Sequence, residues 1–276
     1  MPPMKLEYAR SLLFLPASNA RAIEKARGLA CDMVILDLED AVPEPEKADA
    51  RRAAVAAIAD GFGNKQVAVR LNMAGTRWHQ EDVAAFSGTA ADLLVLPKVE
   101  SAAQAERVYR ECGRPVIAMI ESVKGLMEAN AIAAAAGTAA LFVGINDLRT
   151  DLRVPEGVGR AGLVTALQMI VMAARLSGKA VFDGVYNRLD DPDAFMAECR
   201  EGHEYGFDGK TLIHPNQIAT ANMIFGPSLP ALEDAYRLIA AASGGAERFE
   251  GRMIEAMHVT AARALIARAE ACGMGR

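Results

Sequence analysis

Short, almost continuous apolar runs recur along the chain, and an alanine-rich stretch with helical spacing follows them. The first run reads SLLFLP (Ser11–Pro16) and the second MVILDL (Met33–Leu38), without the alternation of a half-exposed strand. Continuous runs of this kind are typical of parallel strands that are covered on both faces. Eight of them are found, at residues 11–16, 33–38, 66–71, 92–97, 115–120, 140–145, 179–185 and 209–214.

The segments between these runs have the spacing of helices. They lie at residues 19–29, 46–59, 80–86, 101–111, 123–136, 162–176 and 192–205. Eight strands that alternate with helices place the chain in the α/β class and predict a (β/α)8 TIM barrel. An open, doubly wound sheet is the alternative, but no GxGxxG or Walker A glycine loop follows any of the runs.

The last part of the chain is longer than one closing helix requires. We therefore predict a barrel domain at residues 1–226 and a C-terminal helical extension at residues 227–276. Within the extension, helices are expected at residues 228–242 and 257–272, on either side of a break at residues 243–245. Such an extension would serve either as a lid over the barrel or as an arm that packs on a neighbouring subunit.

Composition and charge exclude several classes of protein. Of the 276 residues, 52% are hydrophobic and 24% are charged, which excludes a disordered chain. The net charge of −5 and the 5% of aromatic residues argue against a nucleic acid as partner. The four cysteines have no metal-binding spacing, and no apolar run has the length of a signal-peptide core or a membrane span. We therefore expect a cytoplasmic protein without a membrane partner.

Polar residues stand where the predicted strands end. In a barrel of this kind the active site lies at the carboxyl ends of the strands. Seven strands end in such residues, which are Asp37, Glu39, Asp40, Arg70, Asn72, Lys98, Glu121, Ser122, Asn146, Asp147, Asp183 and His214. One polar strand end would mean little, but seven favour an active site at one rim of the barrel.

Two carboxylates in this group, Glu121 and Asp147, follow adjacent predicted strands. Their side chains should lie within reach of one hard divalent cation, Mg²⁺ or Mn²⁺, whose other positions are left to water and substrate. Each carboxylate is also explained by an ion pair with a basic side chain or by a cap on the next helix.

Arg70 is the natural counter-charge among these carboxylates. Its guanidinium offers a fork for a substrate carboxylate or a developing oxyanion; alternatively, it balances the charges of Asp37 and Glu39. Glu39 and Asp40 could orient a metal-bound water, or they cap the turn that precedes Pro43.

Basic residues gather in the first two strand–helix units, at Arg10, Arg21, Lys25, Arg27, Lys47, Arg51 and Arg52. They could hold the phosphates of a nucleotide-like group, or they form solvated helix faces with glutamate partners. Lys98 is expected to act electrostatically rather than as a Schiff base. His214 is explained as well by a structural role as by a role as base. No GxSxG motif and no paired cysteine and histidine support an acyl-enzyme mechanism.

Seven motifs occur in order between residues 10 and 226. They are RSLLFLPAS (Arg10–Ser18), VILDLEDAV (Val34–Val42), VRLN (Val69–Asn72), LPKVES (Leu96–Ser101), MIESVKGL (Met119–Leu126), FVGINDL (Phe142–Leu148) and GFDGKTLIHPNQI (Gly206–Ile218). With these motifs the sequence resembles the citrate lyase β-subunit-like family of CoA-ester lyases, which includes malyl-CoA and citramalyl-CoA lyases.

The resemblance implies a Mg²⁺-dependent TIM barrel in which Glu121 and Asp147 bind the metal and Arg70 binds the substrate near the reacting centre. Enzymes of this family are commonly homotrimers or larger oligomers, which implies a homotrimer or a hexamer here. The resemblance also implies that three basic residues help to hold the CoA group, namely Arg10, Lys47 and Arg51.

The sequence departs from the family in its last motif. Malyl-CoA and citramalyl-CoA lyases end in a pattern like DGKMIDxPH, whose Asp reaches into the site of a neighbouring subunit as an acid or base. The matching stretch here is FEGRMIEAMHV (Phe249–Val259), with Glu255 in place of the Asp and Met257 in place of the Pro. The resemblance therefore makes Glu255 the candidate acid or base, one methylene longer than its counterpart.

Together these features predict an enzyme that cleaves a 3-hydroxy-carboxyacyl-CoA of the citryl-, malyl- or citramalyl-CoA type into an acyl-CoA and a keto acid by retro-Claisen chemistry. Mg²⁺ would chelate the substrate, Arg70 would stabilise the developing negative charge, and the proton would pass to Glu255 or to a water held by Glu39 and Asp40. Three alternatives stay open: a metal-dependent aldolase on a free hydroxy keto acid, a thioesterase of the malyl-CoA type, and the β subunit of a citrate lyase complex that acts on an acyl-carrier protein.

Overall fold

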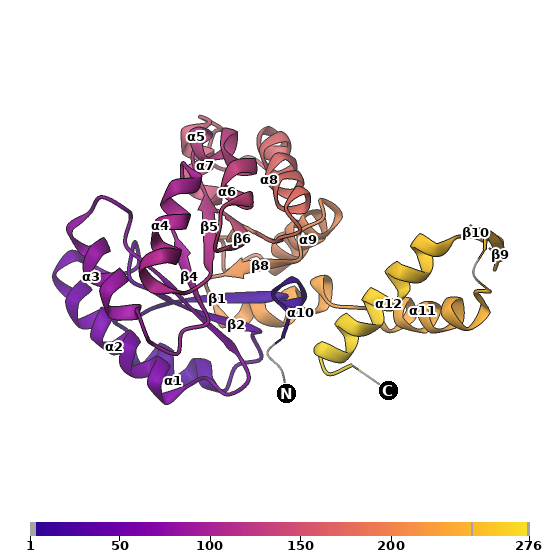
Figure 1. Cartoon of the computed structure of the whole chain (residues 1–276), viewed down its shortest axis with the longest axis horizontal. Helices are drawn as coiled ribbons and strands as arrows, with labels where there is room; N and C mark the ends of the chain where they lie inside the picture. Colours follow the sequence, from indigo (N-terminus) through magenta and orange to yellow (C-terminus); the bar gives the residue numbers. More distant parts are fainter. Residues whose placement is uncertain (1–3, 244, 275–276) are drawn as a thin grey trace.

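The strands form a closed barrel. The computed structural model covers the whole chain, and the structure describes residues 4–243 and 245–274. Eight parallel strands pair in chain order, and β1 pairs with β8 to close the sheet (Figure 1). Their bounds are β1 (Ser11–Pro16), β2 (Met33–Asp37), β3 (Gln66–Arg70), β4 (Leu93–Leu96), β5 (Val116–Ile120), β6 (Thr138–Val143), β7 (Ala180–Asp183) and β8 (Gly209–Leu212). The predicted TIM barrel is confirmed, and each strand overlaps its predicted run.

Helices cover the outside of the barrel. They are α1 (Ala20–Arg27), α2 (Lys47–Asp60), α3 (Arg77–Phe86), α4 (Ala102–Cys112), α5 (Val123–Met127), α6 (Ala129–Ala134), α7 (Ile145–Asp151), α8 (Val164–Leu176), α9 (Pro192–Glu204) and α10 (Ile218–Phe225). The helix predicted at residues 123–136 is interrupted at Glu128, which divides it into α5 and α6. The sequence pattern does not predict α7 and α10, because both are short and directly follow apolar runs.

Alternate residues of each strand point in opposite directions, so the barrel has an inner and an outer apolar layer. Ile35 and Val95 belong to the inner cluster, which fills the barrel. Their neighbours Val34 and Leu94 belong to the outer cluster, between the strands and the helices. Because the interior is filled with side chains, a substrate can bind only at an end of the barrel.

A C-terminal arm, residues 229–274 apart from residue 244, projects from the barrel (Figure 1). It consists of α11 (Leu229–Ala241), a hairpin of β9 (Glu247–Phe249) and β10 (Arg252–Ile254), and α12 (Ala256–Ala271). Leu238, Phe249 and Ile254 belong to a small apolar cluster of its own. The hairpin is too short to be predicted from the sequence pattern. Gly244, in the predicted break, lies outside the described residues.

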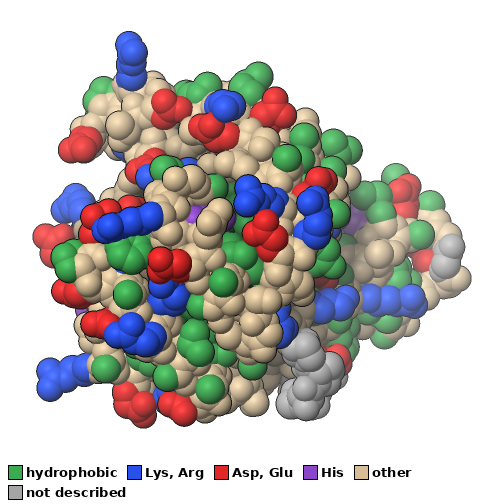
Figure 2. Space-filling model, turned by 60° about the vertical axis from the view of Figure 1, so that its left-hand side comes forward, with side chains coloured by type: hydrophobic (Ala, Val, Ile, Leu, Met, Phe, Trp, Pro, Cys, Tyr) green, Lys and Arg blue, Asp and Glu red, His purple; other side chains and the backbone are tan. Residues whose placement is uncertain are grey.

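The surface carries both signs of charge. Figure 2 shows basic and acidic side chains interspersed over one face of the molecule, which agrees with the small net charge of −5. Among residues 4–243 and 245–274, no helix combines the length and the apolar character that a membrane span requires.

A group of charged side chains lies buried between β7, β8 and α9. The Nζ atom of Lys210 donates to Asp183 Oδ2 at 2.9 Å and to Glu198 Oε1 at 2.8 Å. Arg160 donates to the same Asp183 oxygen at 2.7 Å, and Asp183 and Lys210 are both fully buried. The prediction that Asp183 lies at the rim is therefore wrong. Phe182 points into the barrel, so the next side chain is turned outwards into the helix layer.

Candidate active site

A cavity of about 380 Å³ opens at the carboxyl ends of the strands. Much of its wall is apolar, from residues that include Phe14, Met119, Val143, Val185 and Ile213. Its charged lining residues come from the ends of β2, β3 and β5 and from the segment after β6, and these are Asp37, Asp40, Arg70, Glu121 and Asp147. An apolar cavity with a few convergent polar groups is the usual form of a small-molecule site.

Arg70, the last residue of β3, is held from several sides. Its Nε and Nη2 atoms donate to the two oxygens of Asp37 at 2.7 and 2.6 Å, and its Nη1 lies 3.0 Å from Glu39 Oε2. Its guanidinium carbon lies 5.0 Å from the centroid of the Phe14 ring. Burial alone would lower the pKa of Arg70, but the hydrogen bonds to Asp37 and its negative charge raise this pKa. Arg70 is therefore a fixed positive charge at the cavity wall.

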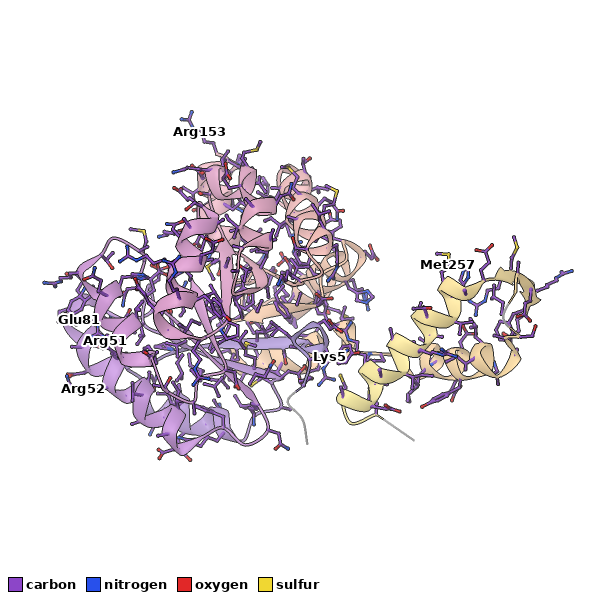
Figure 3. The ribbon with its side chains drawn as sticks, in the orientation of Figure 1. Lys5, Arg51, Arg52, Glu81, Arg153 and Met257 are labelled. Carbon is purple, nitrogen blue, oxygen red and sulfur yellow. The ribbon has the colours of Figure 1, made fainter. Side chains whose placement is uncertain are left out.

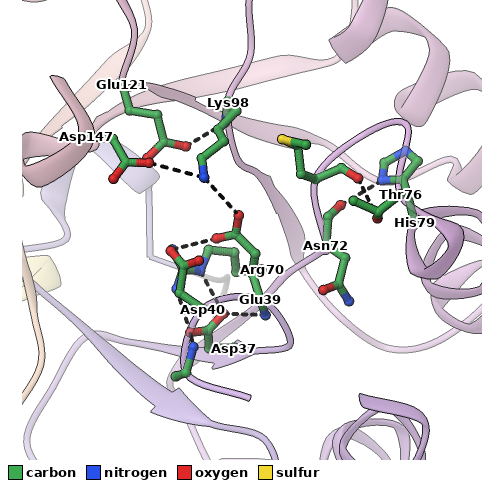
Figure 4. A network of polar contacts seen from close by, with 12 residues as sticks. Asp37, Glu39, Asp40, Arg70, Asn72, Thr76, His79, Lys98, Glu121 and Asp147 are labelled. Atoms are coloured by element: carbon green, nitrogen blue, oxygen red, sulfur yellow. Dashed lines mark hydrogen bonds and ion pairs between the residues drawn. The ribbon is translucent and has the colours of Figure 1, made fainter. Parts of the chain in front are cut away.

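Glu121 and Asp147 come together at the opposite side of the cavity (Figure 4). Glu121 directly follows β5, whereas Asp147 lies in the first turn of α7 rather than at the end of a strand, because β6 ends at Val143. Burial raises the pKa of Glu121 to about 7, and the negative charge of Asp147 contributes to the rise. Two neighbouring carboxylates, one of them buried, form a site that a cation would stabilise.

The residue before α7 leaves room for this arrangement. Gly144 has an ordinary negative φ of −85°, but a Cβ atom there would collide with the side chain of Glu121. No group of three or more His, Cys, Asp or Glu side chains within the described ranges is arranged to hold a metal. Mg²⁺ is commonly bound by one or two carboxylates and completes its shell with water and substrate. Glu121 and Asp147 therefore fit Mg²⁺.

Glu39 and Asp40, in the turn after β2, differ in their surroundings. Glu39 is 7% exposed and lies between Arg70 and Lys98. Burial raises the pKa of Glu39 to about 8, against the positive charge of Arg70. The side chain of Asp40 is 65% exposed and lies 3.6 Å from Arg70 Nη1. Glu39 is thus the buried carboxyl group of the two, and its pKa is the raised one.

Lys98 connects the two sides of the rim (Figure 4). Its backbone N–H donates to Glu121 Oε1 at 2.6 Å. Its Nζ atom lies 3.2 Å from Asp147 Oδ2 and 3.8 Å from Glu39 Oε1. Burial alone would lower the pKa of Lys98, but its hydrogen bond to Asp147 and the negative charge of Glu39 raise it. The sequence places Lys98 at the rim but gives no sign of this bridging position.

A second, more polar cavity of about 590 Å³ adjoins the first. Glu121 and Asp147 line both cavities, whereas Lys98 lines only the second. Its other lining residues are Met73, Ala74, Glu100, Gln104, Ser122, Thr150 and Asp151. The two carboxylates therefore stand in the wall between an apolar and a polar cavity.

Other residues at the strand ends serve the backbone. Ser122 accepts from the N–H of Gly125 and caps α5. His214 Nδ1 accepts from the N–H of Asn216 at 3.2 Å. Asn72 is bound by Lys47 and by the carboxylate of Asp82. These three rim residues therefore have structural partners outside the cavity.

Arg10 is not brought to this rim. It precedes β1 and therefore lies at the amino end of the barrel, opposite the cavity. Its guanidinium forms two hydrogen bonds of 2.8 Å with Asp32, the residue before β2. The structure thus gives Arg10 a role in joining β1 and β2 and places it away from any CoA group at the carboxyl ends.

Lys47 and Arg51 are both buried in α2. The Lys47 ammonium donates to the backbone oxygens of Leu38 and Glu39 at 2.8 and 2.9 Å and so holds the turn after β2. Arg51 pairs with Asp82 and with Glu81 of α3, on the outer side of the barrel (Figure 3). Both side chains are buried and engaged, so neither is free to bind a phosphate group of a ligand.

Glu255 lies far along the arm, next to Met257, which Figure 3 places on α12. Its carboxylate caps the first turn of α12 through the N–H of His258, and its own N–H donates to His258 Nδ1 at 3.0 Å. Within one chain Glu255 is therefore at a helix end on the projecting arm and not at the cavity.

Phe14 and Gly144 are site residues that the reasoning from single residues does not identify. Phe14 supports Arg70, and Gly144 makes room for Glu121. An apolar strand residue and a glycine carry no chemical signal of their own. Both stand inside motifs that carry the family resemblance, SLLFLP and FVGIND, and only that context points to them.

Two known families match the sequence. Residues 10–215 match the family described as HpcH/HpaI aldolase/citrate lyase. Residues 158–274 match the family described as C–C bond lyase of the TIM-barrel fold.

Individual relatives agree with these matches. A (3S)-malyl-CoA thioesterase from Cereibacter sphaeroides is 41% identical over 270 residues, which are 95% of this chain and 95% of the relative. CitE from Mycobacterium tuberculosis, solved with magnesium, acetoacetate and coenzyme A, has a TM-score of 0.81 at 34% identity and covers 96% of this chain and 100% of its own. A citrate lyase β subunit from the same organism, solved with oxaloacetate and magnesium, has a TM-score of 0.71 at 34% identity and covers 81% of this chain and 100% of its own.

Proposed function

The chain belongs to the HpcH/HpaI aldolase/citrate lyase family, and from this premise we propose that it is a Mg²⁺-dependent carbon–carbon lyase. Its substrate is a 3-hydroxy-carboxyacyl-CoA of the citryl-, malyl- or citramalyl-CoA type, and its products are an acyl-CoA and a keto acid. The observation that carries the proposal is the pair of carboxylates Glu121 and Asp147 at an apolar cavity, with Arg70 on the facing wall.

Glu121 and Asp147 would hold the Mg²⁺ ion. When bound, Mg²⁺ supplies Lewis-acid chemistry, because it polarises oxygen atoms of the substrate and lowers the pKa of a hydroxyl. Two relatives support this choice, since the M. tuberculosis structures are complexes with magnesium. The acetoacetate and oxaloacetate in those complexes support a keto acid as one of the products.

The side chains of this protein account for the proton and the charge. Glu39, buried between Arg70 and Lys98, accepts the proton of the substrate's 3-hydroxyl, directly or through a water. The bond between the hydroxyl-bearing carbon and the carbon next to the thioester then breaks, and its electron pair moves into the thioester enolate. The hydroxyl oxygen becomes the keto oxygen of the acid. Arg70, fixed by Asp37, stabilises the negative charge that develops.

The phosphates of CoA need exposed positive charge near the cavity. Arg21 and Lys25 are exposed on α1, which begins just after the end of β1, and Phe14, Leu15 and Pro16 of that strand line the cavity. We therefore assign the CoA contact to Arg21 and Lys25, in place of the three residues that the resemblance implies.

Hydrolysis of the thioester in the same site is a second candidate function. It is favoured by the 41% identity to a (3S)-malyl-CoA thioesterase over 95% of both chains. In this reaction water attacks the thioester carbonyl, the carbon–sulfur bond breaks, and the hydroxy acid leaves with the free CoA thiol. A single product measurement separates the two reactions.

We expect purified protein with Mg²⁺ to release keto acid from one or more CoA esters in a panel of malyl-, citramalyl-, β-methylmalyl- and citryl-CoA. Keto acid and free thiol are followed separately, and EDTA should stop the reaction until Mg²⁺ is restored. Keto acid without free thiol supports the lyase. Free thiol without keto acid contradicts the lyase and supports the thioesterase. If neither keto acid nor free thiol appears, the lyase and the thioesterase are both contradicted. That result would favour an aldolase on free hydroxy keto acids or a citrate lyase complex with an acyl-carrier protein.

The arm supports an oligomer in which it reaches a neighbouring subunit. Leu229, Met253 and Met257 are 64%, 66% and 68% exposed on an arm that projects from its own barrel (Figure 1). Exposed apolar side chains on a projecting element favour a contact with another protein. We propose that the chain is a homotrimer or a hexamer, and that Glu255 of the arm returns a proton to the carbon of the enolate formed on a neighbour.

Co-expression of two inactive variants tests this role. Asp147→Asn leaves the arm intact, and Glu255→Gln leaves the rim intact. Mixed oligomers should regain up to about a quarter of wild-type activity, because random pairing joins an intact rim to an intact arm in that share of the sites. Oligomers of each variant alone serve as controls. Full activity of Glu255→Gln alone, or no recovery in verified mixed oligomers, would contradict the shared site.

A further inference from the structure

The position of Lys98 is unusual for a lysine. Its φ is +52°, in the left-handed region that lysine rarely adopts. The other two described non-glycine residues with positive φ are Arg153 and Glu250. Both are exposed, and neither lines one of the two cavities described above. Strained backbone at a rim that gathers carboxylates points to a function for that conformation.

The left-handed conformation lets the two ends of Lys98 reach different groups. The backbone N–H donates to Glu121 Oε1 at 2.6 Å, and the side chain turns to bring Nζ within 3.2 Å of Asp147 Oδ2. The same ammonium lies 3.8 Å from Glu39 Oε1 on the facing side. One residue thus touches both proposed metal ligands and the proposed base.

The rim needs more positive charge than Arg70 supplies. Arg70 is already engaged by both oxygens of Asp37 and by Glu39. A substrate that binds there adds a carboxylate to a site already rich in carboxylates, and each further negative charge at short range is unfavourable. Lys98 is the described cation that faces Asp147.

We propose that Lys98 is a positioning residue that trades metal affinity for substrate affinity: its ammonium weakens the binding of Mg²⁺ to Glu121 and Asp147 and allows a second anion, the carboxylate of the substrate, to bind beside the metal. This inference rests on the proposed function. The ammonium sits against Asp147 and so competes with the divalent cation for that oxygen. Once the cation is bound, the same ammonium lowers the negative charge that the substrate carboxylate meets.

The test measures binding without catalysis. Lys98→Asn removes the ammonium but suits the left-handed backbone, which asparagine adopts more readily than most residues. We expect Mg²⁺ to bind Lys98→Asn about tenfold more tightly than wild type in calorimetry. Oxalate, a planar dianion that chelates Mg²⁺ through two oxygens as a keto acid does, should bind the Mg²⁺-saturated variant about tenfold more weakly. Lys98→Arg keeps the positive charge, so its affinities for Mg²⁺ and for oxalate should both lie close to those of the wild type.

Lys124→Asn is the matched control. Lys124 lies near the same rim and pairs with Glu100 at 3.0 Å, but its side chain is 71% exposed and touches neither proposed metal ligand. Its replacement should change neither the affinity for Mg²⁺ nor the affinity for oxalate. Weaker Mg²⁺ binding in Lys98→Asn, or two unchanged affinities, would overturn the inference, because a merely structural lysine would not shift them in opposite directions. Absence of Mg²⁺ binding to the wild-type protein would instead refute the proposed function.

Discussion

Asp147→Asn is expected to remove measurable Mg²⁺ binding and to lower kcat/KM for the CoA ester by on the order of a thousandfold. Asp147 offers a half-buried carboxylate from the first turn of α7, beside the buried Glu121. The amide keeps the shape of the side chain but loses the charge that a hard cation requires. Because the metal would act on the transition state as well as on binding, excess Mg²⁺ should not restore the rate.

The loss is measured with Mn²⁺ as a spectroscopic probe, since only free Mn²⁺ gives the sharp solution signal, and by steady-state kinetics on the same preparations. Asp151→Asn is the control. Asp151 lies one helical turn further along α7 and accepts from the N–H of Val123 at 2.6 Å, a bond that asparagine can keep. It should bind Mn²⁺ as the wild type does. Unchanged Mn²⁺ affinity in Asp147→Asn would refute the metal assignment.

A second variant should weaken metal binding without replacing either proposed ligand. Gly144→Ala keeps a backbone with φ of −85° that alanine adopts freely, but its Cβ would displace the Glu121 side chain. It should therefore weaken Mn²⁺ binding as well. Gly28→Ala is a suitable comparison, because a Cβ at Gly28 meets only Lys25 O at 3.8 Å. Weaker Mn²⁺ binding in both Asp147→Asn and Gly144→Ala would show that the site depends on the geometry of the carboxylate pair as well as on its charge.

Asp183→Asn is expected to lower the free energy of unfolding by about 3–5 kcal/mol, the usual cost of removing one partner from a buried ion pair. The change removes the buried negative charge between Lys210 and Arg160. The single amide oxygen of asparagine also cannot replace both carboxylate oxygens, of which Oδ2 accepts from Lys210 and Arg160 and Oδ1 accepts from the N–H of Gly184. The melting temperature should fall by roughly 2–4 °C for each kcal/mol of lost stability in a chain of this size. Calorimetry and urea unfolding of both proteins provide the measurement.

The difference should depend on pH in one direction. Burial alone would raise the pKa of Asp183, but the charges of Lys210 and Arg160 outweigh it, and the pKa is lowered. A carboxylate with a depressed pKa stabilises the fold above its unfolded-state pKa of about 3.9, and this stability is lost as the pH falls through the lower folded-state pKa. The difference between wild type and variant should therefore be constant near neutral pH and shrink only in strong acid.

The exposed pair Arg107–Glu111 supplies the control, because its side chains are 61% and 41% exposed. Glu111→Gln should cost less than about 0.5 kcal/mol. Adding Lys210→Met to Asp183→Asn should recover part of the loss, since it removes one of the uncompensated charges. A loss of less than about 1 kcal/mol in Asp183→Asn would show that the buried group is not what holds β7, β8 and α9 together.

The order of strands was predictable from the sequence because parallel strands covered on both faces leave continuous apolar runs. The same signal does not say which way a terminal side chain points. Asp183 and Asp37 both end a strand, yet only Asp37 lies at the cavity, while Asp183 is turned into the helix layer. The direction depends on the register of neighbouring residues in the barrel, which one strand's sequence does not contain.

The candidate site was partly predictable for a related reason. Carboxylates and an arginine at strand ends fall at one rim in any parallel barrel, so Arg70, Glu121 and Asp147 were found together. The resemblance implied a CoA contact for Arg10, but this residue precedes β1 and therefore lies at the amino end of the barrel, opposite the cavity. The bridge formed by Lys98 depends on a backbone angle that no motif encodes.

The pairing of β1 with β8 has a consequence for the growing chain. Ser11 pairs with Lys210, so one edge of the first strand stays unpaired until the last strand has been made. Until then β1 and the most recent strand both present unpaired backbone groups, and such edges template pairing with other chains. Pairing β1 with β8 closes the long segment between them, and this closure has a mainly entropic free-energy cost that falls late in folding. A nascent or truncated chain that ends before β8 is therefore an open sheet prone to aggregation rather than a smaller barrel.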